Sequence, residues 1–374
     1  TVYNSNPFDT TALSGNRIWD IYKDQDGDIW SLTDKSLDLY IYGINKFKRY
    51  STGSKPTFVT QDLEGLLWVA TESNGLFSIN KKTGNKRNYV FKPSDPYSIS
   101  SSNFDSKQFN PIVIDTSGNI WVGTVSGLNY YRKDKDFFQR FMSSTSNLNT
   151  VSNNRINTLL VQDNEIYIGT PSGLDKINTN DFSIDRLAQS QWFSPLNQYS
   201  VNKLLDFGSD KNMAGFWVAT TTGMVFYNGA YQMFEDLAWD YLFGQYINNV
   251  DSDSKGNLWI DVVAFTGLIH FKTENFFQNS GMFDDTDFTL LQPSADGSLT
   301  EVDEPQSIAN ANINDLFIDS HDNLWVGTQL GLNHLINTSQ NFNSITKGPK
   351  QLKGENVRSV LIDDNENIWV SHEK

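Results

Sequence analysis

The chain has 374 residues and carries 29 Lys and Arg against 44 Asp and Glu, a formal net charge of −15 at pH 7. This acidic balance argues against binding to nucleic acid or to an anionic membrane surface, because both attract clustered Lys and Arg. The absence of cysteine excludes a disulfide framework, a thiol nucleophile and thiolate metal ligands. No uninterrupted apolar run is long enough to span a bilayer.

One pattern recurs along the chain: an apolar strand, an Asp, a short turn, a second apolar strand centred on Trp, another turn, and Gly-Leu. The clearest copies are residues 62–76, 115–128 and 319–332. Repeats of about 40–50 residues are typical of β-propellers or of helical arrays, and short β-branched and aromatic runs bounded by Gly, Asn and Asp favour strands. The repeat therefore predicts a propeller. Its central aromatic positions, in chain order, are Trp30, Trp68, Trp121, Tyr167, Trp217, Trp259, Trp325 and Trp369.

Two positions within the repeat predict specific contacts. An Asp lies six residues before the Trp in most copies, as Asp62 does before Trp68, and a Gly often follows three residues after the Asp. Asp-x-x-Gly predicts a tight turn, in which the carboxylate caps a backbone N–H and Gly adopts positive φ. We expect the Trp to fill the space between blades. The Gly or Ala two residues later, such as Gly123, is expected to let another backbone approach closely.

Several stretches depart from the pattern. The first copy has Ser36-Leu37 in place of Gly-Leu, and residues 186–199, 238–245 and 272–310 fall outside the repeat. The last of these stretches is acidic and contains Ser and Pro, so it predicts an extended loop.

We predict an all-β fold, a β-propeller of four-stranded antiparallel blades. Seven blades with a partial extra repeat at the C-terminus are favoured, and an eight-bladed ring is the alternative. Residues 1–350 are assigned to the propeller, and residues 351–374 to the start of a further repeat or to ring-closing strands. Residues 1–9 align with the end of a repeat near residues 89–96. The N-terminal strand is therefore expected either to complete the last blade or to belong to a slice of a longer array.

The repeats resemble the periplasmic two-component regulator propeller family. The resemblance is carried by residues 14–19, 152–157 and 312–317, and by residues 92–103, which match the family's linker. It implies a periplasmic sensor domain of a hybrid two-component system, with no catalytic activity of its own. It further implies that an oligosaccharide is recognised, that a homodimer relays the signal through a membrane helix to a histidine kinase outside this chain, and that transcription of utilisation genes follows.

Residues with catalytic or metal-binding potential form no recognisable site. The segment from Asp24 to Asp28 resembles part of a calcium loop but lacks its terminal Glu, so we favour a turn over a cation site. Ser126 and Ser172 lack the spacing of a nucleophile elbow and are expected in hairpins. We predict no catalytic residue, no metal and no cofactor. The histidines are far apart and lack metal-site spacing, which favours solvated or structural roles for His270, His321, His334 and His372.

Aromatic residues outside the repeat are the candidates for ligand binding, because Trp and Tyr combine a large apolar face with a polar group. The alternative interpretation is that these residues cover a blade edge. The acidic balance favours a neutral oligosaccharide as the ligand. The candidate residues are Trp192, Phe193, Trp239, Tyr241 and Tyr246.

Two other functions fit the same fold, since fold does not determine function. A carbohydrate-active propeller enzyme, a glycosidase or a lyase, would need a pair of carboxylates contributed by loops of different blades. A protein-binding propeller scaffold would need a flat apolar rim around the aromatic insertions.

Overall fold

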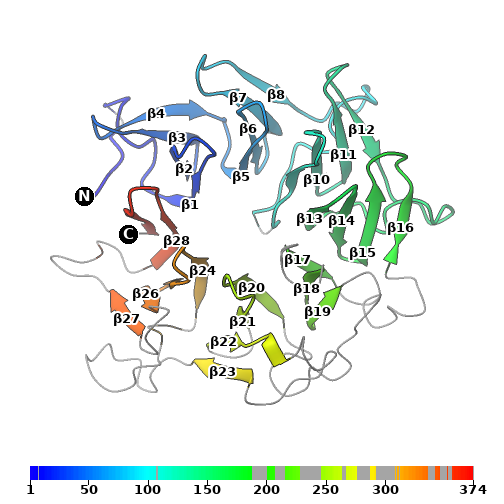
Figure 1. Ribbon diagram of the computed structural model, residues 1–374. Helices are drawn as coiled ribbons and strands as arrows, with labels where there is room; N and C mark the ends of the chain where they lie inside the picture. Colours follow the sequence, from blue (N-terminus) through cyan, green and yellow to red (C-terminus); the bar gives the residue numbers. More distant parts are fainter. Residues whose placement is uncertain are drawn as a thin grey trace. The chain divides into compact units, whose positions relative to one another are not determined.

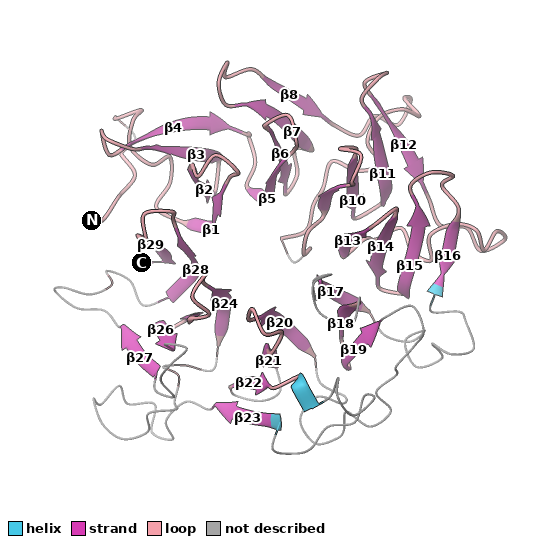
Figure 2. Ribbon diagram, viewed as in Figure 1, coloured by secondary structure: helices cyan, strands magenta, loops and turns pink. Residues whose placement is uncertain are grey.

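The computed structural model describes residues 1–6, 8–106, 108–187, 200–206, 215–227, 246–262, 267–275, 287–291, 308, 310, 312–335, 342–345, 352 and 356–373. Within these residues it contains 29 β-strands and only isolated helical turns (Figure 1 and Figure 2). The strands form eight sheets, and neighbours in each sheet follow one another in the sequence.

The first four sheets each have four strands. Their bounds are β1 (Ile18–Lys23), β2 (Ile29–Thr33), β3 (Ser36–Ile41), β4 (Lys46–Ser51); β5 (Pro56–Gln61), β6 (Leu66–Thr71), β7 (Leu76–Asn80), β8 (Lys86–Tyr89); β9 (Ile112–Ile114), β10 (Ile120–Thr124), β11 (Gly127–Arg132), β12 (Phe137–Phe141); β13 (Thr158–Gln162), β14 (Glu165–Thr170), β15 (Gly173–Asn178) and β16 (Ile184–Arg186).

The fifth sheet shows three strands in the described residues, the sixth and seventh show four each, and the last shows two. Their bounds are β17 (Val201–Asp206), β18 (Phe216–Thr220), β19 (Gly223–Tyr227); β20 (Ile247–Ser252), β21 (Leu258–Val262), β22 (Leu268–Phe271), β23 (Phe288–Leu291); β24 (Ile313–Ile318), β25 (Leu324–Thr328), β26 (Gly331–Leu335), β27 (Phe342–Ile345); and β28 (Asn356–Ile362) and β29 (Ile368–Glu373).

This topology confirms the predicted fold class, all-β with antiparallel propeller blades. Seven successive sheets are blades, which is the favoured number, and β28–β29 form the partial repeat that follows them. The predicted loop over residues 272–310 lies largely outside the described residues, although β23 falls within it as an outer strand. The domain boundary at residue 350 stays a prediction.

The chain divides into two compact units. The first contains Thr1–Ser5, Gly15–Lys23 and Leu205–Lys374, and the second contains Asn6–Ser14 and Asp24–Leu204. In both units a sheet packs against the next sheet along the chain: β5 contacts β2 and β9 in the second unit, and β24 contacts β20 and β28 in the first. The repeat therefore produces the same layered packing in each unit.

The Asp of the repeat has two structural roles. Asp62 Oδ1 accepts hydrogen bonds from the backbone N–H groups of Glu64 (3.0 Å) and Leu66 (2.9 Å), and Asp62 Oδ2 accepts one from the indole N–H of Trp68 (2.8 Å). The predicted turn is thus confirmed, and the indole bond explains the six-residue spacing. The same indole bond joins Asp24 to Trp30, Asp115 to Trp121, Asp319 to Trp325 and Asp363 to Trp369.

Five tryptophans of the repeat pack against the following sheet, as predicted: Trp68, Trp121, Trp217, Trp259 and Trp325. Trp121 is completely buried and lies in one cluster with Ile156, Ile166 and Ile168 of the fourth sheet. Burial of a side chain of this size contributes several kcal/mol, on the order of 3–5 kcal/mol when judged by truncation to Ala. These clusters are the core of the blades.

The Gly or Ala after the Trp allows neighbouring sheets to approach. A Cβ atom on Gly123 would lie 2.5 Å from Cγ2 of Ile156, and one on Gly327 would lie 2.8 Å from Cγ1 of Val357. Val357 lies in β28, the first strand of the next sheet, and Ile156 lies two residues before β13, the first strand of its sheet. The position is therefore closely packed, as predicted, but the neighbour is a side chain of the next sheet and not a backbone.

An Arg on the outer strand of three blades holds the linker that enters the blade. Arg140 of β12 donates from Nε to the carbonyl of Ser98 (2.6 Å) and from Nη2 to the carbonyl of Asp95 (2.9 Å). Such bonds satisfy carbonyl groups that lack a partner in a sheet. The equivalent residues are Arg49 on β4 and Arg186 on β16.

In the first unit β1 lies beside the two-stranded β28–β29 sheet (Figure 1). Ser359 Oγ donates a hydrogen bond to Asp20 Oδ1 (2.8 Å), and Lys23 Nζ forms an ion pair with Asp364 Oδ1 (2.8 Å). Strands from the two ends of the sequence are thus adjacent, which places the side chains of β1 and β28 within reach of one another.

Candidate functional site

The aromatic residues that the sequence nominated for ligand binding fall mostly outside the described residues. Trp192, Phe193, Trp239 and Tyr241 lie there, so their grouping stays a prediction. Tyr246 is described: it directly precedes β20, and 39% of it is exposed to solvent. A ligand can therefore reach Tyr246.

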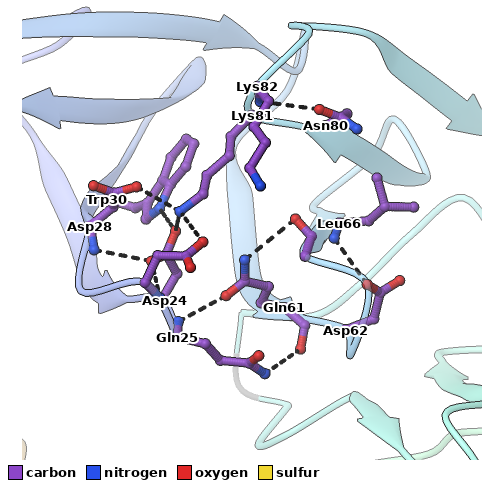
Figure 3. A network of polar contacts seen from close by, with 12 residues as sticks. Asp24, Gln25, Asp28, Trp30, Gln61, Asp62, Leu66, Asn80, Lys81 and Lys82 are labelled. Carbon is purple, nitrogen blue, oxygen red and sulfur yellow. Dashed lines mark hydrogen bonds and ion pairs between the residues drawn. The ribbon is translucent and has the colours of Figure 1, made fainter.

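The acidic segment that resembled a calcium loop is a turn that surrounds an ammonium group (Figure 3). Lys81 Nζ lies 2.6 Å from Asp24 Oδ2, 2.8 Å from Asp26 Oδ2 and 2.6 Å from Asp28 Oδ2. Burial by itself lowers the pKa of Lys81, but the bonds to the three carboxylates outweigh it and raise the pKa above its ordinary value. The favoured interpretation as a turn is confirmed, and the lysine supplies the positive charge.

The turns of the first two sheets are also joined beside this lysine. Gln61 Oε1 accepts a hydrogen bond from the backbone N–H of Gln25 (2.8 Å), and Gln25 Nε2 donates to the carbonyl of Gln61 (3.3 Å), as Figure 3 shows. Together these contacts tie the turn after β1 to the second sheet within the second unit. The cluster is therefore a structural connection between blades.

Two histidines stack on tryptophans of the repeat. The ring of His270 lies 4.0 Å from that of Trp259, and the ring of His334 lies 3.7 Å from that of Trp325, both nearly parallel. Burial lowers the pKa of His270 to about 4, so this ring is neutral at pH 7. The structural role predicted for these two histidines is confirmed.

The serines with a superficial likeness to nucleophiles lie in hairpin turns, as predicted. The backbone N–H groups of Ser126 and Ser172 each donate 3.0 Å hydrogen bonds, to Thr124 Oγ1 and Thr170 Oγ1 respectively. Among the described residues no three His, Asp or Glu side chains come together as a metal site would require. Nor does that part of the chain include a helix with the length and apolarity to cross a bilayer.

The first strands carry a recurring β-bulge. The pairing between the first and second strand shifts register at the same place in four sheets, and the residue at the shift has no partner in the ladder. Bulges turn a side chain away from the sheet and often lie beside functional sites. Because Ile18-Trp19-Asp20-Ile21 aligns with these segments, Trp19 holds the equivalent position in β1. The residues at the four shifts are Thr57, Asn248, Asn314 and Arg358.

Asn at this position joins neighbouring first strands. Asn314 Nδ2 donates to the carbonyl of Val357 in β28 (2.7 Å), and Asn157 Nδ2, just before β13, donates to the carbonyl of Val201 in β17 (2.9 Å). An Asn at this position therefore has a structural role, which a residue of another type does not fill in the same way.

Trp19 and Arg358, the two largest residues found in place of this Asn, contact each other in the first unit. The guanidinium carbon of Arg358 lies 5.6 Å from the centre of the Trp19 ring, and that of Arg17 lies 4.9 Å from the same ring. Both distances are those of cation–π contacts. Arg17 is exposed, and Trp19 and Arg358 are half-buried, so solvent reaches all three. We call these residues the Trp19 cluster and take it as the candidate functional site.

The chemistry of the Trp19 cluster suits a polar ligand that has an apolar face. Guanidinium groups present planar N–H donors that match carboxylate oxygens, and they stack on aromatic rings through their faces. An indole offers apolar surface to a ligand alongside. Sequence reasoning missed the cluster. A signal was present, since Trp19 and Arg358 occupy a position where several repeats have Asn.

A second residue missed by sequence reasoning is Asp261. It occupies the place two residues after Trp259, where five other copies have Gly or Ala, and it is almost completely buried. Asn248 Nδ2 donates a hydrogen bond to Asp261 Oδ2 (2.6 Å). Burial raises the pKa of Asp261 to about 6 despite this bond. A carboxyl at a position reserved for small residues was the available signal.

Comparison with known families confirms the resemblance seen in the repeats. Residues 12–35 and 307–329 match the model of the two component regulator propeller. The first of these stretches contains Arg17 and Trp19. No curated protein matches the chain in sequence.

Comparison with solved structures shows the fold. The extracellular domain of the hybrid two component system BT3049 from B. thetaiotaomicron is 19% identical with a TM-score of 0.57, over 96% of this chain and 50% of that one. PorZ, a surface component of the type-IX secretion system of Porphyromonas gingivalis, is 12% identical with a TM-score of 0.56, over 98% and 47%. The WD40 β-propeller domain of Doa1 is 10% identical with a TM-score of 0.50, over 97% and 92%. The chain thus spans about half the length of the first two domains.

Proposed function

We propose that this chain is a non-catalytic, extracytoplasmic sensor domain of a hybrid two-component system, and that its ligand is an oligosaccharide. The observation that carries the proposal is the match of two repeats to the two component regulator propeller model. The fold shared with the extracellular domain of BT3049 is consistent with it. The periplasm is the proposed location, with the chain as the ectodomain of an inner-membrane protein.

Within this proposal, ligand binding biases the arrangement of two copies, and a membrane helix relays that bias to a histidine kinase. A ligand shifts such an equilibrium only by binding one arrangement more tightly than the other. Side chains that leave the strand ladder, as those at the first-strand bulges do, are suited to this contact because changing them leaves the sheets intact. The Trp19 cluster and Tyr246 are therefore the proposed contact residues among those described.

Calorimetric titration of the 374-residue chain with a panel of plant, yeast and host glycan fragments tests the proposal. We expect one fragment class to bind with a dissociation constant in the micromolar range, equivalent to about −8 kcal/mol. An assay for new reducing ends in the same mixtures separates a sensor from a carbohydrate-active enzyme. Failure of every fragment to bind argues against direct glycan sensing, and release of product argues against the non-catalytic role.

A further inference from the structure

We infer that the Trp19 cluster binds the carboxylate of an acidic sugar, so that the recognised oligosaccharide contains hexuronate residues. This inference rests on the proposed function, because it takes an oligosaccharide as the ligand. It differs from the expectation drawn from composition, which favoured a neutral sugar. The reason is that a ligand responds to the charge of the few groups it touches, whereas the net charge of −15 is spread over the whole chain.

The first argument is the position of Arg358. In β28 the pairing with β29 runs from Val357 opposite His372 to Ser359 opposite Ser371, so Arg358 is the extra residue of the bulge. A bulged residue contributes nothing to the ladder and its side chain is re-aimed. The guanidinium of Arg358 therefore reaches the ring of Trp19 on β1 and remains half exposed to solvent.

The second argument is what the cluster replaces. At the equivalent place in β24, Asn314 bonds both Asn356 Oδ1 (2.8 Å) and the carbonyl of Val357 (2.7 Å) on the next first strand. Arg358, at the equivalent position of β28, has no short side-chain amide that could make such bonds. Packing alone does not call for the change, since Asn already connects the strands with two hydrogen bonds. Positions that break a local rule in this way are expected at functional sites.

The third argument is charge. Two guanidinium groups lie against one indole ring, so the cluster presents two positively charged groups to a ligand that reaches the ring. Each guanidinium has five N–H donors, so one that already bonds a protein group still has donors for a carboxylate. A carboxylate that meets both arginines would accept charge-assisted hydrogen bonds from them.

Two carboxylates of the neighbouring first strands make contacts that connect these strands. Asp20 Oδ1 accepts hydrogen bonds from Ser359 Oγ (2.8 Å) and from the backbone N–H of Ile21 (2.8 Å), and Asp315 Oδ2 accepts one from the backbone N–H of Val360 (2.9 Å). These acids therefore join strand to strand.

The test is calorimetric titration of the 374-residue chain with trigalacturonate and with the neutral galactose trisaccharide of the same linkage. We expect trigalacturonate to bind at least about tenfold more tightly, which corresponds to about 1.4 kcal/mol. Raising NaCl from about 50 mM to about 500 mM should weaken only the acidic trimer, because salt screens exposed charges. Equal affinities for the two trimers, or no binding of trigalacturonate, would overturn the inference.

Variants locate the binding. R358N restores the amide that the repeat uses, so it should fold, and it should weaken trigalacturonate binding about tenfold. The matched control is K133Q. Lys133 and Glu64 form an exposed ion pair within the second unit, away from the Trp19 cluster in sequence, and the variant removes the positive charge of that pair. Circular dichroism and thermal melting confirm that both variants are folded. An equal loss in both variants would overturn the assignment to the Trp19 cluster, as would an unchanged R358N.

The outcomes separate this inference from the function beneath it. If neutral fragments bind and R358N leaves them unaffected, the sensor function stands and the acidic-sugar inference fails. If no glycan of the wider panel binds, direct glycan sensing fails and the inference fails with it. If trigalacturonate alone binds and R358N abolishes the preference for it, both are supported.

Discussion

The Asp–Trp turns and the first-strand bulges are two regions of the same repeat that behave in opposite ways. Five sheets share the indole bond between an Asp and the Trp six residues later, with distances between 2.8 and 3.1 Å. The bulge holds Thr, Asn, Asn and Arg in the four sheets where it is observed. Residues that shape the turn recur from sheet to sheet, whereas a residue outside the ladder is free to differ, and we propose that this difference marks a ligand contact.

The largest expected effect separates the two classes of tryptophan. Trp121→Ala removes a fully buried ring from the core and should lower the free energy of unfolding by about 4 kcal/mol. Trp19→Ala, at a half-exposed position, should cost no more than about 1 kcal/mol. Urea titration of both variants measures the difference. Similar losses would show that Trp19 also belongs to the fold, and would break the comparison.

A turn that departs from the others should show the next effect. In the first copy a lysine from the following sheet reaches the Asp of the turn, and the side chain of Asp24 is completely buried beneath it. Lys81→Met leaves the buried Asp24 carboxylate without its ammonium partner and should destabilise the chain by about 3 kcal/mol. Lys133→Met, which breaks an exposed ion pair, should cost less than about 1 kcal/mol and serves as the control. A loss no larger than the control's would show that the buried pair contributes little.

The buried carboxyl of Asp261 should make stability depend on pH. Folding raises its pKa from the ordinary value of 3.8 to about 6. The folded state therefore holds the proton more tightly than the unfolded state, so this group's contribution is favourable below pH 4 and is lost as the pH rises to about 6. Asp261→Asn should add about 2–3 kcal/mol at pH 7 and nothing at pH 3. Chemical denaturation at both pH values is the measurement, and an equal gain at each would contradict the raised pKa.

The smallest effect concerns the turn residue three positions after the Asp. Gly65 and Gly118 have φ values of 81° and 82° there, whereas Glu366 has φ 63°. Because a residue with a Cβ is strained in this region, Glu366→Gly should stabilise the chain by about 0.5 kcal/mol, and Gly118→Ala should destabilise it by about 1 kcal/mol. Thermal melting of both variants tests this pair. Shifts of the same sign would exclude backbone strain as the cause.

Sequence reasoning predicted the fold but did not single out the Trp19 cluster, for a common physical reason. The spacing of Asp115, Gly118 and Trp121 reports a turn whose contacts all lie within six residues, so a single copy already contains the information. Candidate ligand residues were instead sought among aromatic insertions, most of which lie outside the described residues. Trp19 and Arg358 were present in the alignment of repeats, but each looks unremarkable until its neighbour is known.

The amino-acid sequence by itself determined the blades: their strand order, the capped turns, the tryptophans between sheets and the small residues that let sheets approach. These features depend on contacts within one repeat or between a repeat and the next, and periodicity reports them directly. Only the tertiary structure decided that Lys81 enters the turn at Asp24, and that β1 lies beside β28 so that Arg358 reaches Trp19. Such pairs join residues far apart in the chain, and their meeting depends on how successive sheets pack rather than on any local pattern.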